Sequence, residues 1–125
     1  MPMGYDYPAL LRVSAKATVE ANAANATLTA ANLGKIQTNT GAGAGITLTL
    51  PAANTVAGCA VRAAVTVAQT IQFVPASGDK IFLNGSGAAD KYAQIAGVIG
   101  NYIEVYSDGV DYVVTDYAGV ATKQA

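Results

Sequence analysis

Hydrophobic and polar residues alternate along much of this chain. In ITLTL, residues 46–50, isoleucine and leucine take every second position and threonine lies between them. A period of two places successive side chains on opposite faces of a strand, so a strand with one buried face is predicted here. Residues 61–68 alternate in the same way, with valine or alanine at each odd position. A second strand with one buried face is therefore predicted over 61–68.

Shorter alternating or apolar segments follow, each bounded by residues that favour turns. They span residues 35–38, 71–73, 81–83, 92–95, 102–106 and 110–114. The last two flank Ser107-Asp108-Gly109 and are typical of a β-hairpin, because glycine supplies the positive φ of a tight link. Short strands separated by turns about every ten residues indicate a sandwich or barrel. We therefore predict an all-β fold, a small antiparallel β-sandwich or barrel.

The alanine-rich segment 14–31 has high helix propensity but no apolar stripe at helical spacing. We predict an extended stretch or strand that ends at residues 26–30, followed by a turn at 32–34. A short helix over residues 15–25 is the alternative.

The glycine run GAGAG, residues 41–45, raises the question of a phosphate-binding loop. Such a loop follows a strand, opens a helix and usually carries a lysine with serine or threonine. Here the run contains no lysine and precedes a predicted strand. We interpret it as a turn between two strands.

Residues 1–13 differ from the rest of the chain and are predicted to form an extended N-terminal arm, followed by one β-rich domain over residues 14–125. Prolines 2 and 8 disfavour a helix. Bulky side chains on an arm are costly to leave in water, so they are expected to pack on another subunit or on the arm's own domain. These side chains are Tyr5, Tyr7, Leu10 and Leu11.

Composition limits the partners of the chain. Charged residues make up 12% of it and the formal net charge is −1, so no basic patch for nucleic acid is expected. A weakly charged surface suits close contact with other proteins. No signal peptide or membrane helix is recognisable, which predicts synthesis in the cytoplasm and no membrane partner. The single cysteine, Cys59, has small or apolar neighbours and is predicted to be buried and inert.

Few residues suit catalysis. The chain has no histidine, which removes the commonest general base and metal ligand. Glu104 and Asp111 could lie near each other on adjacent strands and form a carboxylate pair or calcium site, but an exposed polar face is the simpler interpretation. We predict no catalytic residue, no cofactor site, no metal site and no enzymatic activity.

Tyrosines concentrate near the C-terminus, where residues 92–117 hold five of the seven. We expect Tyr102, Tyr106 and Tyr112 to stabilise the sheet through cross-strand contacts. A subunit interface or a carbohydrate-stacking surface built from the same three side chains is the alternative.

The order of turns and strands resembles a module of tailed-bacteriophage virion proteins, the small β-rich proteins that decorate or cement capsids. The same module resembles terminal domains of phage fibres. The shared elements cover about residues 27–114 and are turn and strand motifs. They fall at Gly34-Lys35, Asn39 to Ala42, Leu50-Pro51-Ala52, Pro75 to Asp79, Gly85 to Ala88 and Ser107 to Gly109. The hairpin of that group often closes with tryptophan, where this chain has Tyr112.

The resemblance implies a homotrimeric, non-enzymatic virion protein on the outer capsid surface. It would bind the joints between major capsid subunits and stabilise the shell, with the arm as an anchor to the shell or to sister subunits. A receptor- or glycan-binding fibre component is the alternative function. A fold does not determine an activity, so the function follows by analogy.

Overall fold

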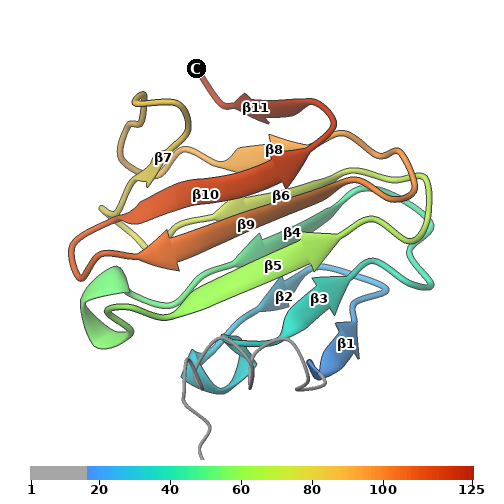
Figure 1. Cartoon of the computed structure of the whole chain (residues 1–125), viewed down its shortest axis with the longest axis horizontal. Coiled ribbons are helices and arrows are strands. Elements are labelled where there is room, and N and C mark those ends of the chain that lie inside the picture. The colour runs from blue at the N-terminus through green and yellow to red at the C-terminus, as the bar shows by residue number, and fades with distance from the viewer. Residues whose placement is uncertain (1–16) are drawn as a thin grey trace, which may run out of the picture.

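A computed structural model describes residues 17–125, which form two β-sheets packed face to face (Figure 1). The prediction of an all-β fold is confirmed. The arm predicted for residues 1–13 lies outside the described residues. The six-stranded sheet has the order β1 (Val19–Ala21), β3 (Ile36–Thr38), β5 (Ala60–Ala64), β9 (Tyr102–Ser107), β10 (Tyr112–Ala118) and β7 (Ile81–Phe82). The five-stranded sheet has the order β11 (Ala121–Lys123), β8 (Ala93–Ile95), β6 (Ile71–Val74), β4 (Ile46–Thr49) and β2 (Ala26–Thr27).

From β1 to β6 the chain winds as a coil. Each strand lies in the sheet opposite to that of the strand before it, so β1, β3 and β5 are parallel neighbours in one sheet. The strands β2, β4 and β6 are parallel neighbours in the other. A parallel pair needs a connection that crosses over, and here the intervening strand in the opposite sheet forms that connection.

After the coil, β8 to β11 add antiparallel pairs to both sheets, and β7 pairs with β10 in parallel. The strands β9 and β10 form the predicted hairpin, in which Asp108 Oδ1 accepts hydrogen bonds from the amides of Val110 and Asp111, both at 2.8 Å. Gly109 adopts φ +94°, the positive value that the link was expected to need. The hairpin therefore follows directly from its turn residues.

The prediction of an antiparallel sandwich is wrong in its strand directions. Five of the nine strand pairs in residues 17–125 are parallel, so both sheets are mixed. A short turn between two strands can reverse the chain within one sheet or carry it to the facing sheet. The turn residues are the same in both cases, so the sequence pattern does not distinguish them.

Alternation places the apolar residues in the core as predicted. Ile46, Leu48 and Leu50 are at most 3% exposed, while Thr47 and Thr49 face outward. Strand β5 does the same, with Val61 and Ala63 buried against the facing sheet. The rest of the core comes from Phe73, Ile71, Ile95, Ile103, Val105 and Tyr112.

The alanine-rich segment is extended in its described part, and the alternative helix does not form in residues 17–25. It contains β1, β2 and a single 3-10 turn, η1 (Ala30–Asn32); a second such turn, η2 (Ala53–Thr55), follows β4. Neither helical segment is long or apolar enough to span a membrane, a finding limited to residues 17–125.

The glycine run connects β3 to β4, as interpreted, and carries the chain from one sheet to the other. Gly41 adopts φ +88°, and a Cβ at Gly45 would lie 2.5 Å from Thr70 Oγ1. The buried amide of Asn39 joins this connection to the one between β5 and β6. Its Nδ2 donates to the carbonyls of Val67 and Gln69 at 2.9 and 3.0 Å, and its Oδ1 accepts from the amides of Thr66 and Val67.

Candidate functional site

The arm residues Tyr5, Tyr7, Leu10 and Leu11 lie outside the described residues, so their role stays a prediction. The surfaces of residues 17–125 that can take part in function are the outer faces of the two sheets, their edges and the turns at their ends.

A charged cluster occupies the centre of the outer face of the six-stranded sheet. The strand register places Arg62 beside Glu104, and Glu104 beside Asp116. Arg62 Nη2 lies 3.4 Å from a carboxylate oxygen of each acidic residue. All three side chains are between 29% and 48% exposed, and exposed ion pairs of this kind contribute about 0–1 kcal/mol each. The single positive charge of Arg62 offsets one of the two carboxylates, so the cluster keeps a formal net charge of −1.

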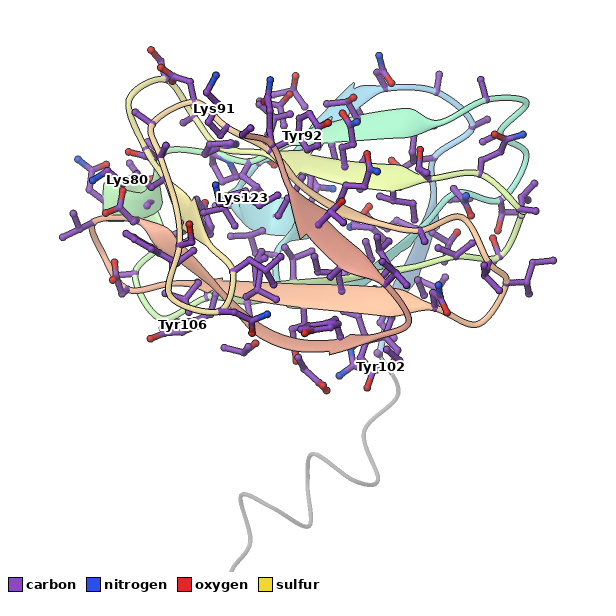
Figure 2. All side chains as sticks on the ribbon, turned by 90° about the horizontal axis from the view of Figure 1, so that it is seen from above. Lys80, Lys91, Tyr92, Tyr102, Tyr106 and Lys123 are labelled. Atoms are coloured by element: carbon purple, nitrogen blue, oxygen red, sulfur yellow. The ribbon has the colours of Figure 1, made fainter. Side chains whose placement is uncertain are left out.

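Tyr102 and Tyr106 lie on this same outer face, one on each side of Glu104 along β9, and both are half-buried. The guanidinium of Arg62 stacks on the Tyr102 ring at 4.2 Å from its centre. The hydroxyl of Tyr102 donates to Asp116 Oδ2 at 3.2 Å. Figure 2 shows the two tyrosines on one side of the molecule, with Lys91 and Tyr92 on the opposite side. The predicted cross-strand contacts are therefore present for Tyr102, and both side chains are partly exposed.

Tyr112 does not belong to this contact surface. It is fully buried between the sheets, and its hydroxyl donates to the Pro51 carbonyl at 2.7 Å. Burial, with a smaller contribution from the charge of Asp79, raises the pKa of Tyr112 to about 12. Tyr112 is a core residue, so the proposed secondary surface consists of Tyr102 and Tyr106 alone.

Glu104 and Asp111 are not paired, and the suggested carboxylate site does not form. The register of the hairpin places Glu104 opposite Asp116, with a bulge between Val114 and Asp116. Asp111 lies at the turn end of the hairpin, where its Oδ1 accepts a hydrogen bond from the Lys80 amide at 2.9 Å. The two carboxylates serve different structural roles.

Sequence reasoning missed a polar network at the β1 end of the sandwich. Glu20 Oε1 accepts hydrogen bonds from Gln37 Nε2 at 2.7 Å and Asn32 Nδ2 at 2.8 Å, and Lys35 Nζ lies 3.2 Å from Oε2. These donors lower the pKa of Glu20 to about 2, and the hydrogen bonds from Gln37 and Asn32 contribute most of this shift. The available signal was that Glu20 and Gln37 occupy alternating positions on β1 and β3, and the register aligns them.

On the outer face of the five-stranded sheet, a row of four uncharged side chains runs across β4, β6, β8 and β11. Thr47, Gln72, Gln94 and Thr122 form one row, in which Gln72 Nε2 donates to Gln94 Oε1 at 2.9 Å. A second row contains Thr27, Thr49 and Val74. We call these seven residues the uncharged face. Its side chains are small or hydrogen-bonded to one another, which suits contact with a flat protein surface.

Exposed apolar side chains gather on two adjoining turns at one end of the sandwich. Val98 and Ile99 lie between β8 and β9, and Val120 lies between β10 and β11; each is at least 61% exposed. The Ala96 amide donates to the Val120 carbonyl at 2.9 Å, which joins the two turns. Large apolar residues at turn positions are typical of a contact with another molecule.

The prediction for Cys59 is wrong, because this cysteine is exposed. It lies in the turn after η2, next to Gly58 at φ +81°, and burial by alternation begins only at Val61. Within residues 17–125 no group of three His, Cys, Asp or Glu side chains could hold a metal ion.

Comparison of the sequence with models of protein families and with curated proteins finds no match.

Proposed function

We propose that this chain is a structural virion protein, a homotrimeric capsid decoration protein of a tailed bacteriophage. It binds the outer capsid surface and stabilises the shell by bridging neighbouring major capsid subunits. It is made in the host cytoplasm and has no enzymatic activity. The proposal starts from the resemblance of the turn and strand motifs, and the surfaces of the two sheets support it.

The observation that carries the proposal is the uncharged face of the five-stranded sheet. Seven outward positions on five neighbouring strands hold threonine, glutamine and valine, without a single ionisable group. Removing charge from water is costly, so a face without charge loses little on close contact with protein. Because many symmetric copies would make the same contact, their small contributions would add up to a large stabilisation of the shell.

Binding to capsids tests this proposal. Capsids of the encoding phage that lack this protein are incubated with the full chain, and the bound fraction is measured by sedimentation. We expect saturation at a regular number of copies. A chain with Gln72→Lys and Gln94→Lys should bind much more weakly, because two charges would have to lose their water. A chain without residues 1–12 should also lose binding while the body stays folded, as circular dichroism would show.

The matched control is Val110→Lys, since Val110 is 70% exposed in the turn of the β9–β10 hairpin, which belongs to the other sheet. This variant should bind like the unaltered chain. Full occupancy by the double lysine variant would exclude the uncharged face as the binding surface. Full occupancy by the truncated chain would exclude the arm as an anchor.

One observation favours the alternative, a receptor- or glycan-binding fibre component. Tyr102, stacked on Arg62, and Tyr106 present aromatic surface beside two carboxylates on an open sheet, a combination that sugars can contact. Copy number separates the two functions, because hundreds of copies per virion fit a shell protein and a few dozen fit a fibre. Loss of cell adsorption with Tyr102→Ala and Tyr106→Ala, at unchanged capsid binding, would favour the fibre.

A further inference from the structure

A shallow groove of about 590 Å³ crosses the outer face of the six-stranded sheet at the point where the described chain begins. Its small lining residues are Ala17, Gly34 and Ala60, beside Ile36. Lys35, Arg62 and Glu104 also line it and supply charges of both signs. The groove therefore has room for large side chains and partners for polar ones.

Among residues 17–125, no strand pairs with the outer edge of β1, which lies beside this groove. β1 is the outermost strand, and its outward side chains are those of Val19, which is 60% exposed, and Ala21. Its one charged residue, Glu20, is held by Gln37 and Asn32 within the polar network. Edge strands are usually protected by outward lysines, prolines or bulges, and β1 has none of these. An uncovered edge of this kind can accept a further extended chain.

We propose that the groove and the adjoining edge of β1 bind the N-terminal arm of a second copy of this chain, through residues 5–12. The arm has bulky tyrosine and leucine side chains where the groove has alanine and glycine. It also carries Asp6 and Arg12, which match the basic and acidic groups of the groove. Pro8 favours an extended backbone in this segment, and because it has no N–H to donate it must occupy a position whose N–H side faces away from β1.

The sequence favours the arm of a second copy over the chain's own arm. Ala17 lines the groove and leads directly into β1, so the chain's own arm would have to reverse direction before residue 17 in order to pair with the edge of β1. Residues 9–16 contain no glycine, proline, asparagine or aspartate, and Ser14 is their only residue of a type that favours tight turns. Sixteen extended residues reach roughly 50 Å, enough to extend past the chain's own body to a neighbouring one.

This inference goes beyond capsid binding and needs no capsid for its test. It assigns the arm to a sister subunit, which leaves the uncharged face for the shell. Failure of the assays below would leave the capsid proposal standing, and failure of capsid binding would leave the subunit contact standing.

Cross-linking to Cys59 tests the contact, because this exposed thiol is the only one in the chain and directly precedes Ala60 of the groove. A full-length chain with Leu10→Cys and Cys59→Ser is co-expressed with the unaltered chain and treated with a short bis-maleimide. We expect a covalent dimer that contains one chain of each kind. The chain with Leu10→Cys and native Cys59 serves to detect internal links. An internally linked monomer, or no cross-link between the two chains, would overturn the proposal.

Filling the groove gives a second test. Ala60→Phe should lower the cross-linked yield and weaken association about tenfold or more, measured as the shift to monomer in light scattering. Ala64→Phe is the matched control, since Ala64 faces outward on the same strand and does not line the groove. If Ala60→Phe associates like Ala64→Phe, the groove is not the binding site.

A third variant covers the case in which Ala60→Phe does not fold. Tyr7→Ser with Leu10→Ser and Leu11→Ser changes no residue of either sheet and should produce the same shift to monomer. Unchanged association of this variant would also overturn the proposal.

Discussion

Glu20 is a carboxylate in an inward-facing register position, held by an amide from β3, an amide from η1 and the Lys35 ammonium. Such a group stays ionised because its donors stabilise the charged form. The β1 end of the sandwich therefore carries a polar network in place of an apolar core. The network joins β1, η1 and β3, so the carboxylate of Glu20 holds β1 in place at the start of the coil.

The network predicts how stability depends on pH. The pKa of Glu20 falls from an ordinary value of 4.5 to about 2 in the folded chain. A depressed pKa stabilises the fold above the unfolded value, and this contribution disappears as the pH falls through the folded value. The unaltered chain should therefore exceed Glu20→Gln in stability above about pH 5, and the difference should shrink between pH 4.5 and pH 2. Urea unfolding across this range measures it, and a constant difference down to pH 2 would exclude this role.

The Tyr112 hydroxyl predicts a second residue-level effect. Tyr112→Phe leaves the partly buried Pro51 carbonyl without its donor and should reduce the free energy of unfolding by about 1 kcal/mol. Tyr106→Phe is the control, because Tyr106 lies on the outer face, and it should change stability by less than about 0.5 kcal/mol. Equal effects of the two substitutions in denaturant titrations would contradict the buried hydrogen bond.

At the scale of the elements, the sequence predicted strand positions better than strand partners. Alternation over residues 46–50 reveals a buried face because threonine and leucine differ strongly in hydrophobicity. It does not reveal whether the next strand lies in the same sheet. The coil from β1 to β6 depends on turns that cross between sheets, and contacts such as those of Asn39 with Val67 and Gln69 join residues far apart in sequence.

The same limit explains the errors at the site. Tyr102 and Tyr106 alternate with buried Ile103 and Val105, so the sequence pattern alone predicts that both tyrosines face outward. On β10 the adjacent residues Tyr112, Val113 and Val114 are all apolar, and the face of Tyr112 follows only from its pairing with Ser107. The groove and the Glu20 network are each built from residues of several strands, and the sequence pattern does not predict which strands lie next to one another.

Close contact between two turns supplies a prediction at this scale. A Cβ at Gly97 would lie 2.5 Å from the backbone carbon of Gln69, so the turn after β8 approaches the turn before β6 without room for a side chain. Gly97→Ala should therefore cost about 1–3 kcal/mol of stability. Gly43→Ala is a matched control, because a Cβ at Gly43 meets nothing within 4 Å. Equal thermal stability of the two variants would show that these turns can separate freely.

For the whole molecule, charge is scarce and nearly balanced between basic and acidic residues. Seven basic and eight acidic residues give a net charge of −1. On the six-stranded sheet, Arg62 lies between Glu104 and Asp116, and the uncharged face of the other sheet has no ionisable group to attract a partner. Long-range attraction is therefore weak, and association has to depend on shape and short-range contact.

This distribution predicts that capsid binding depends little on salt. Ionic strength screens interactions between exposed charges but leaves buried apolar and neutral hydrogen-bonded contacts almost unchanged. Across a roughly tenfold range of salt concentration, the apparent affinity of the unaltered chain should change by less than about threefold. Sedimentation with capsids at each salt concentration measures this, with the Gln72→Lys variant as a comparison that introduces one charge into the contact. A steep loss of binding with salt would instead indicate a charged contact through lysines that form no ion pair within residues 17–125, such as Lys80, Lys91 and Lys123 (Figure 2). In that case the capsid would bind the lysine-bearing end of the sandwich, and the uncharged face would be available for a different partner.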